Sequence, residues 1–235
     1  MMPRRGLPVD GMQKEDHQER LYYLPYHWML RSFPRVSTEL RNETAVKALR
    51  FGAGHRILDL GCGDGFFTGY LKTTFPESFV VGADYYLRAI RFARIMTDDS
   101  PYVAASAMAL GFKSGCFDAV FLLDVVEHLD GEDRKQALRE AARALRPGGV
   151  IVVTVPSNRL PVIPMHYRHF DVRGLARLMQ EHFTDVVVTG CCRHLPGAHH
   201  LTRFPVIWRL IQFAVRECDP HKAVTLIACA KKTAE

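Results

Sequence analysis

The chain has 235 residues, of which 48% are hydrophobic and 24% are charged, and this is long enough for one sizeable α/β core. The net charge is +6, and the basic residues are spread through the sequence and alternate with acidic ones. This pattern indicates a solvated surface and does not favour nucleic acid as a partner. Residues 1–11 lack the apolar core of a secretory signal, and no apolar run is long enough to cross a bilayer.

The cysteine pattern favours reduced thiols. No C-x-x-C pair occurs, and Cys62, Cys116 and Cys229 lie in or beside apolar runs. We therefore predict a cytoplasmic protein without disulfides. Cys191 and Cys192 lie near three histidines, but adjacent cysteines without a second pair do not match a zinc site, so no metal ligand is predicted.

The N-terminal region divides into a tail and two short elements. Residues 1–14 are predicted to form a flexible tail. Residues 15–34 are aromatic and basic, and Pro25 and Pro34 are expected to bend or end any helix there. Helical spacing of apolar residues predicts a second helix over 37–50.

Residues 56–67 read as a buried strand, a tight glycine turn and the start of a helix. Gly61, Gly63 and Gly65 permit backbone angles that other residues avoid, and they let a ligand approach the main chain. Their G-x-G-x-G spacing differs from the G-x-G-x-x-G of dinucleotide sites, because Phe66 occupies the position of the third glycine. The turn thus favours a nucleoside-like ligand without a pyrophosphate, or is simply a sharp turn of an α/β domain.

The second predicted strand, 79–84, ends in an acid 19 residues after the last glycine of the turn. Asp84 at this strand tip is placed to accept hydrogen bonds from two ribose hydroxyls. The same position also suits an N-cap for the helix predicted over 85–96. Both roles remain open for this carboxylate.

The centre of the chain alternates strands and helices. Residues 117–123 form a nearly continuous apolar run, typical of a central parallel strand. That strand ends at Asp124, on the sheet edge where open α/β sheets bind ligands. An amphipathic helix is predicted over 131–145, and a further strand over 150–155.

Residues 156–170 form a loop that three prolines stiffen. His166 in this loop is a candidate general base, since the pKa of imidazole lies near neutrality, and a plain surface histidine explains it equally well. His169 is expected at the surface. His128 is the second candidate base, although it and Glu127 also suit a structural role at the end of the preceding strand.

The C-terminal region is predicted to contain strands over 186–188 and 223–230. Between them, residues 201–215 predict an apolar helix. Core packing, a hydrophobic acceptor pocket, a homodimer face and a weak membrane-surface contact all suit such a helix.

Four blocks of sequence occur in an order and spacing that resemble the class I S-adenosylmethionine (SAM)-dependent methyltransferases. They are ILDLGCGDG (57–65), VVGAD (80–84), FDAVFLLDVVEHL (117–129) and LRPGGVIVVTVPSN (145–158). The resemblance implies a Rossmann-like α/β fold with a central, mostly parallel seven-stranded sheet, helices on both faces and an antiparallel last strand. It covers roughly residues 55–160.

The resemblance also implies an organisation within a single domain, 15–235. Residues 15–50 correspond to an N-terminal helical lid, 51–160 to the SAM-binding core and 156–217 to a substrate-side cover. In this family the loop that contains His166 borders the acceptor pocket.

The implied cofactor is SAM, with its adenosyl group held by the glycine turn and Asp84. The cofactor-binding candidates are Asp59, Gly61, Cys62, Gly63, Asp84, Tyr85, Ser106, Ala107, Asp124 and Tyr22. Tyr85 is placed to pack on the adenine or in the core, and Asp124 to face the amino group or sulfonium. Ser106 stands where the family usually has an acid that binds the adenine amino group.

The function implied is in-line methyl transfer to oxygen or nitrogen of a small-molecule or lipid-like acceptor, with His166, or otherwise His128, as general base. A nucleic-acid methyltransferase is the alternative, but residues 123–126 read Leu-Asp-Val-Val instead of the N/D-P-P-Y stretch of base-amino methylases. A non-catalytic SAM-binding protein is a second alternative. The glycine spacing disfavours a NAD-dependent oxidoreductase.

Overall fold

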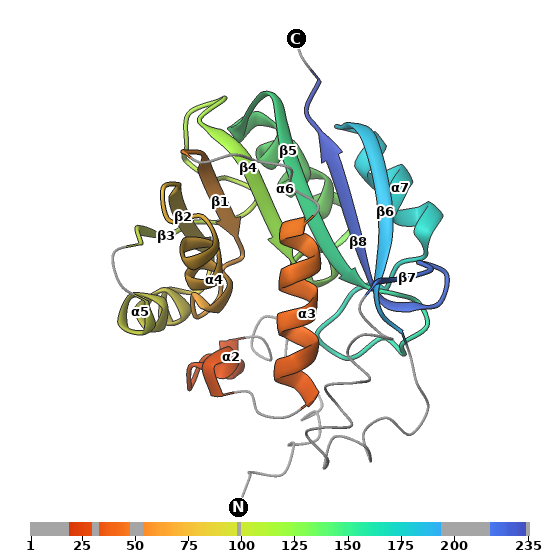
Figure 1. The fold of residues 1–235 in the computed structure, drawn as a ribbon, viewed down its shortest axis with the longest axis horizontal. Coiled ribbons are helices and arrows are strands. Elements are labelled where there is room, and N and C mark those ends of the chain that lie inside the picture. The colour runs from red at the N-terminus through yellow and green to blue at the C-terminus, as the bar shows by residue number, and fades with distance from the viewer. Residues whose placement is uncertain (1–18, 30–32, 48–53, 98–99, 194–216, 234–235) are drawn as a thin grey trace, which may run out of the picture.

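The computed structural model describes residues 19–29, 33–47, 54–97, 100–193 and 217–233. The predicted tail at 1–14 and the predicted helix at 201–215 lie outside these ranges. The described residues form one eight-stranded sheet in the order β3-β2-β1-β4-β5-β8-β6-β7, with helices packed on it (Figure 1).

The first five strands are parallel. They are β1 (Arg56–Leu60), β2 (Phe79–Asp84), β3 (Tyr102–Ala104), β4 (Phe117–Leu123) and β5 (Leu145–Pro156). The chain runs outward from β1 to β3 and then returns to place β4 on the other side of β1. The carboxyl ends of β1 and β4 thus meet at the point where the strand order reverses, which is where open α/β sheets form ligand sites.

The remaining strand pairings are antiparallel. The last strand, β8 (Ala223–Lys231), lies between β5 and β6 (Thr184–Arg193) and is antiparallel to both. The predicted seven-stranded sheet with an antiparallel last strand is therefore confirmed. The two-residue β7 (Glu217–Cys218) adds an eighth strand at the edge of β6.

Alternating side chains of the buried strands face opposite layers, as the strand period requires. On one face Val120 and Leu122 of β4 share an apolar cluster with α6 (Gly131–Ala144) and α7 (Val172–Gln180). On the other face Phe121 belongs to a cluster with residues of α3 and α4. Parallel strands buried on both faces explain the continuous apolar run in the sequence.

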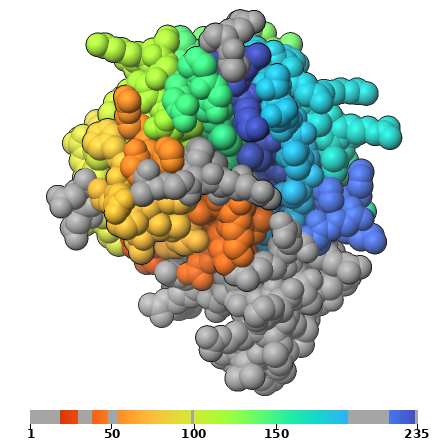
Figure 2. Space-filling model, turned by 45° about the horizontal axis from the view of Figure 1, so that its top comes forward, coloured from red at the N-terminus to blue at the C-terminus, as the bar shows by residue number. Residues whose placement is uncertain are grey.

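The helices on the second face are α3 (Phe33–Lys47) and α4 (Phe66–Thr74), which contact one another. Figure 2 shows the orange surface of α3 between the amber residues that follow β1 and the cyan and blue strands β6 and β8. The sequence predicted this helix over 37–50, whereas α3 starts earlier, at Phe33. Pro34 does not end it, because proline in the first turn removes no intrahelical hydrogen bond.

Two further helices lie close to the ligand side of the sheet. The short α2 (Tyr26–Met29) precedes α3, and α5 (Leu87–Met96) packs on β2 and β3. A 3₁₀ turn, η1 (Val126–His128), follows β4. Among the described residues, no helix is both long and apolar enough to cross a membrane.

Candidate cofactor and acceptor site

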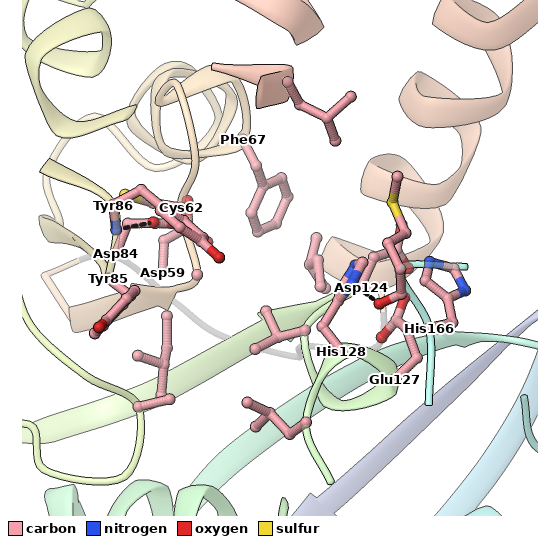
Figure 3. Close-up of a pocket in the computed structure, with 18 of the residues that line it drawn as sticks. Asp59, Cys62, Phe67, Asp84, Tyr85, Tyr86, Asp124, Glu127, His128 and His166 are labelled. Atoms are coloured by element: carbon pink, nitrogen blue, oxygen red, sulfur yellow. Dashed lines mark hydrogen bonds between the residues drawn. The ribbon is translucent and has the colours of Figure 1, made fainter. Parts of the chain in front are cut away.

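A cavity of roughly 570 Å³ opens at the carboxyl ends of the parallel strands. Figure 3 shows its two ends. Asp84, Tyr85 and Tyr86 lie at one end, while Glu127, His128 and His166 lie at the other, with Phe67 and other apolar side chains between them. The cavity therefore has two chemically different ends, and each end can hold a different chemical group.

The glycine turn closes the floor of the first end. Gly61 and Gly63 have φ of 82° and 54°, in the left-handed region that favours glycine. The amide N–H groups of Gly61 and Cys62 both donate to the carbonyl of Ala83, at 2.7 and 3.1 Å. The turn after β1 is therefore tied directly to the end of β2.

Asp84 completes this link from the other side. One carboxylate oxygen accepts from Gly63 N and the other from Tyr86 N, both at 2.8 Å. Burial raises the pKa of Asp84 to about 6, although the two N–H groups act in the opposite direction. Each carboxylate oxygen has a second lone pair, so both oxygens can also accept from a pair of hydroxyls in the cavity.

Asp59 and Cys62 support the turn from below. Asp59 at the end of β1 is buried and accepts a hydrogen bond from Thr68 Oγ1 at 2.6 Å. Burial raises the pKa of Asp59 to about 7 and also raises the pKa of the Cys62 thiol. Cys62 is thus held as a neutral thiol and is not a nucleophile.

The N-terminal segment covers the glycine turn through Tyr22. A Cβ atom on Gly63 would lie 2.8 Å from the hydroxyl oxygen of Tyr22, and the Tyr22 ring lies 5.9 Å from that of Tyr86. Burial, followed by the nearby Asp84 carboxylate, raises the pKa of Tyr22 well above its usual value. The hydroxyl therefore remains protonated beside the turn.

Two contacts that the sequence patterns did not reveal anchor this segment to the turn. His27 donates its backbone N–H to Asp64 Oδ2 at 2.7 Å, and its Nδ1 lies 3.0 Å from Asp64 Oδ1. Trp28 Nε1 donates to the Asp64 carbonyl at 2.9 Å. Asp64 is fully buried by these partners, so the aspartate inside the glycine motif holds the N-terminal cover in place.

Tyr85, Ser106 and Ala107 all border the first end of the cavity. Tyr85 is 66% exposed, so it does not pack in the core and its ring is available to a planar ligand. The Ser106 hydroxyl accepts from Met108 N at 3.2 Å and stabilises its own turn. The serine oxygen nonetheless keeps a second lone pair for a donor in the cavity.

Asp124 lies beside Glu127 and His128 at the second end of the cavity (Figure 3) and is paired with a cation. It has a φ of 55°, accepts from Thr154 Oγ1 at 2.7 Å and forms an ion pair with Arg41 from α3. Burial raises the pKa of Asp124, but the Arg41 cation and the Thr154 hydroxyl outweigh it, and the pKa is lowered. The sequence did not point to Arg41, because a single arginine on a helix carries no pattern.

Three histidines lie together at the second end. The rings of His128 and His166 are perpendicular with centroids 4.6 Å apart, and His166 Nδ1 lies 2.8 Å from His169 Nε2. His169 Nδ1 lies 2.9 Å from the carbonyl of Leu160. The expectation of a surface histidine at 169 is wrong: the side chain is buried because it connects His166 to the backbone.

The span 58–153 matches a family model described as a methyltransferase domain. Residues 58–153 are therefore similar to methyltransferase domains. The chain is also 34% identical over 145 residues to a demethylmenaquinone methyltransferase of Mycobacterium sp. (strain KMS), covering 59% of this chain and 57% of the relative. It is 32% identical over 187 residues to a malonyl-[acyl-carrier protein] O-methyltransferase of Legionella pneumophila, covering 72% of this chain and 63% of the relative.

Both alignments span less than two thirds of the curated relatives' own length. Among solved structures, the N-methyltransferase NodS of Bradyrhizobium japonicum WM9, in complex with S-adenosyl-L-homocysteine (SAH), has a TM-score of 0.65 at 18% identity, covering 93% of this chain and 98% of that chain. This likeness shows the same fold.

The methyltransferase domain has the features that a bound SAM would require. Asp84 offers two carboxylate oxygens beside a turn whose glycines leave room for a ribose, and Tyr85 offers an exposed ring beside them. The methionine part of SAM carries one positive amino group and one negative carboxylate. Asp124 and Arg41, which line the cavity and form an ion pair with each other, offer one charge of each sign to such a ligand.

Proposed function

We propose that this chain transfers a methyl group from SAM to oxygen or nitrogen of a small-molecule or lipid-like acceptor. The observation that carries the proposal is the continuity of the cavity, which joins the glycine turn and Asp84 to the histidines of the loop after β5. Two relatives act, by their names, on demethylmenaquinone and on malonyl-[acyl-carrier protein], which supports a small-molecule or lipid-like acceptor. A third relative, 34% identical over 105 residues, is named for tRNA, so the nucleic-acid alternative is tested alongside.

SAM, when bound, supplies a methyl group activated by a positively charged sulfur. The protein's part is to align the acceptor with that methyl group, and in well-oriented reactions alignment contributes about 7 kcal/mol or more. The glycine turn, Asp84 and Tyr85 hold the donor end, while the loop 156–170 confines the acceptor end. The apolar wall between them, which includes Phe67 and Leu123, keeps water from the line of transfer.

His166 is the proposed general base. A carbonyl oxygen only accepts hydrogen bonds, so Leu160 fixes the proton of His169 on Nδ1. His169 Nε2 then accepts from His166 Nδ1–H, which leaves the lone pair of His166 on Nε2. The same relay stabilises the imidazolium that forms when Nε2 takes a proton. His128, whose pKa burial lowers, is the second candidate.

Replacing His166 by alanine is expected to lower turnover about 100-fold or more, the usual contribution of a general base. Affinity for SAH should stay within twofold of wild type, because His166 lies at the other end of the cavity from Asp84. Turnover is measured with saturating SAM, and affinity by calorimetry. His221→Ala, at an exposed histidine outside the cavity, is the matched control. Unchanged turnover in His166→Ala would remove this residue from the mechanism.

The lid and cover are part of the same proposal. Residues 15–50 act as a lid over the cofactor, which the contacts of Tyr22, His27 and Trp28 at the glycine turn support. Residues 156–217 act as the acceptor-side cover around the core 51–160, which the histidine relay supports.

A cytoplasmic location also belongs to the proposal. The thiols of Cys191 and Cys192 lie 3.4 Å apart without a disulfide bond, and burial raises the pKa of Cys62. Protonated, reduced thiols are typical of a reducing compartment.

The proposed function is tested by incubating the purified protein with methyl-labelled SAM and a metabolite extract, followed by mass spectrometry. We expect label in one or a few small-molecule or lipid products. Label in RNA or DNA added in parallel would favour the nucleic-acid alternative instead. Binding of SAM with no labelled product from any extract would identify a non-catalytic SAM-binding protein.

A further inference from the structure

We propose that Glu127, His128 and His166 form a binding site for a divalent transition-metal cation such as Zn²⁺ or Mn²⁺ at the acceptor end of the cavity. One ligand atom from each of these three residues lies within 4.8 Å of the other two. Glu127 and His128 come from η1 after β4, and His166 comes from the loop after β5 (Figure 3). No spacing in the sequence reveals this group, because the two segments are joined only in the fold.

Hydrogen bonds fix the tautomer of both imidazoles, so that each has its lone pair on Nε2. His128 Nδ1 lies 3.1 Å from the carbonyl of Met165, and since a carbonyl only accepts, Nδ1 carries the proton. His128 therefore has its lone pair on Nε2. The Leu160–His169 relay fixes the same tautomer on His166. Metal-binding histidines are typically oriented by a hydrogen bond of this kind from the other ring nitrogen.

The carboxylate of Glu127 supplies the anionic ligand, and its buried position favours the binding of a cation beside it. Glu127 is 1% exposed, and among the described residues its Oε2 has no hydrogen-bond partner. A buried carboxylate oxygen without a hydrogen-bond partner is costly, and coordination to a metal would remove that cost. The neighbouring cations are already engaged: Arg41 pairs with Asp124, and Arg134 donates to the carbonyls of Val126 and Leu129.

Two imidazole nitrogens and one carboxylate oxygen suit Zn²⁺, Mn²⁺ or Fe²⁺, and three protein ligands leave further coordination positions open. Ligands at about 2.1 Å from a tetrahedral Zn²⁺ lie about 3.4 Å apart, so the three ligand atoms, now within 4.8 Å of one another, would move together by at most about 1.4 Å. Glu127, His128 and His166 all line the cavity, so a metal held by them would supply a Lewis acid to an acceptor bound there.

The metal site does not depend on the proposed methyl transfer, since metal binding is measured without SAM or acceptor. If both proposals hold, metal coordination and proton transfer exclude each other at His166 Nε2, because one lone pair serves only one of them. The coordinated metal then takes over the activation of an acceptor hydroxyl by lowering the pKa of that hydroxyl.

The test is calorimetric titration of the chelator-treated full chain with ZnCl₂, MnCl₂ and CoCl₂ in separate experiments. We expect one cation per chain. The conservative variants Glu127→Gln, His128→Gln and His166→Gln should each weaken cation binding at least 10-fold. Loss of a residue that merely hydrogen-bonds a metal ligand already lowers metal affinity about 10- to 100-fold. His169→Ala should also weaken binding, because it breaks the relay that positions His166. His221→Gln, at an exposed histidine, should leave the metal affinity unchanged.

Two readouts distinguish loss of this site from loss of the fold and from metal binding at cysteine. Retained SAH affinity in each variant shows that the fold and the cofactor end are intact. The absorption spectrum of bound Co²⁺ distinguishes nitrogen and oxygen ligands from the thiolates of Cys191 and Cys192, whose charge-transfer bands should be absent. The proposal is overturned if none of the three cations binds, if binding survives the double variant His128→Gln/His166→Gln, or if cobalt shows sulfur ligation.

Discussion

Asp84→Asn is expected to weaken SAH binding about 100-fold. Hydrogen bonds to a charged group contribute about 1.5–3 kcal/mol each, and the Asp84 carboxylate is proposed to accept two from the ribose. The asparagine amide would also place an N–H group opposite Gly63 N or Tyr86 N, which now donate to the two carboxylate oxygens. Calorimetry with SAH measures the loss, and circular dichroism establishes that the variant is folded.

The pH dependence of SAH affinity provides the internal control for Asp84. Because burial raises the pKa of this carboxyl to about 6, its ionised form is fully present above that pH and is lost as the pH falls through it. Wild-type affinity should therefore fall about tenfold for each pH unit below about 6. Asp84→Asn should show no such fall, while Asp219→Asn at an exposed turn should behave like wild type. Equal affinity of the wild type at pH 5 and pH 8 would contradict the role assigned to Asp84.

Gly61→Ala is expected to destabilise the protein by about 3 kcal/mol and to abolish measurable SAH binding. A left-handed φ costs a residue with a Cβ about 1–2 kcal/mol, and overpacking adds about 1–3 kcal/mol. The added Cβ would lie far inside contact distance of the Val125 side chain, well under the 3.0 Å that Cβ atoms avoid. Thermal unfolding should show a melting temperature about 10 °C lower, since 1 kcal/mol corresponds to about 2–4 °C at this size.

Two further variants separate the backbone cost from the collision. Gly111 also has a left-handed φ, of 68°, but a Cβ there would meet nothing within 4 Å. Gly111→Ala should thus lose only about 1–2 kcal/mol and retain SAH affinity. Adding Val125→Ala to Gly61→Ala should recover the part of the loss that is due to the collision. If Gly61→Ala and Gly111→Ala were equally stable and bound SAH alike, crowding at the turn would not be the cause.

The cofactor end of the site was predictable because it is local in the sequence. The glycine turn and Asp84 belong to one strand–helix–strand unit, and consecutive parallel strands normally pair. Their spacing along the chain therefore keeps them close in space, and β1 and β2 are parallel neighbours. Positive φ angles at Gly61 and Gly63 follow from the same local pattern.

The acceptor end was only partly predictable, because its contacts join distant segments. His166 was a candidate on residue type alone, but its relay through His169 to Leu160 depends on how the loop after β5 folds back. The same is true of Arg41, which reaches Asp124 across 83 positions of sequence, and of His27 at Asp64. Sequence patterns cannot identify such pairs, because each partner taken alone resembles an ordinary surface residue.

By itself, the sequence determined the class of fold, the approximate positions of most strands and the position of the glycine turn. Hydrophobic periodicity and glycine conformation act over a few residues, and that range is enough for these features. Only the tertiary structure decided which charged and ionisable side chains meet across the cavity. Their protonation and pairing depend on burial and on partners from other segments, such as Arg41 beside Asp124 and His128 beside His166, and no local rule of the chain encodes those neighbours.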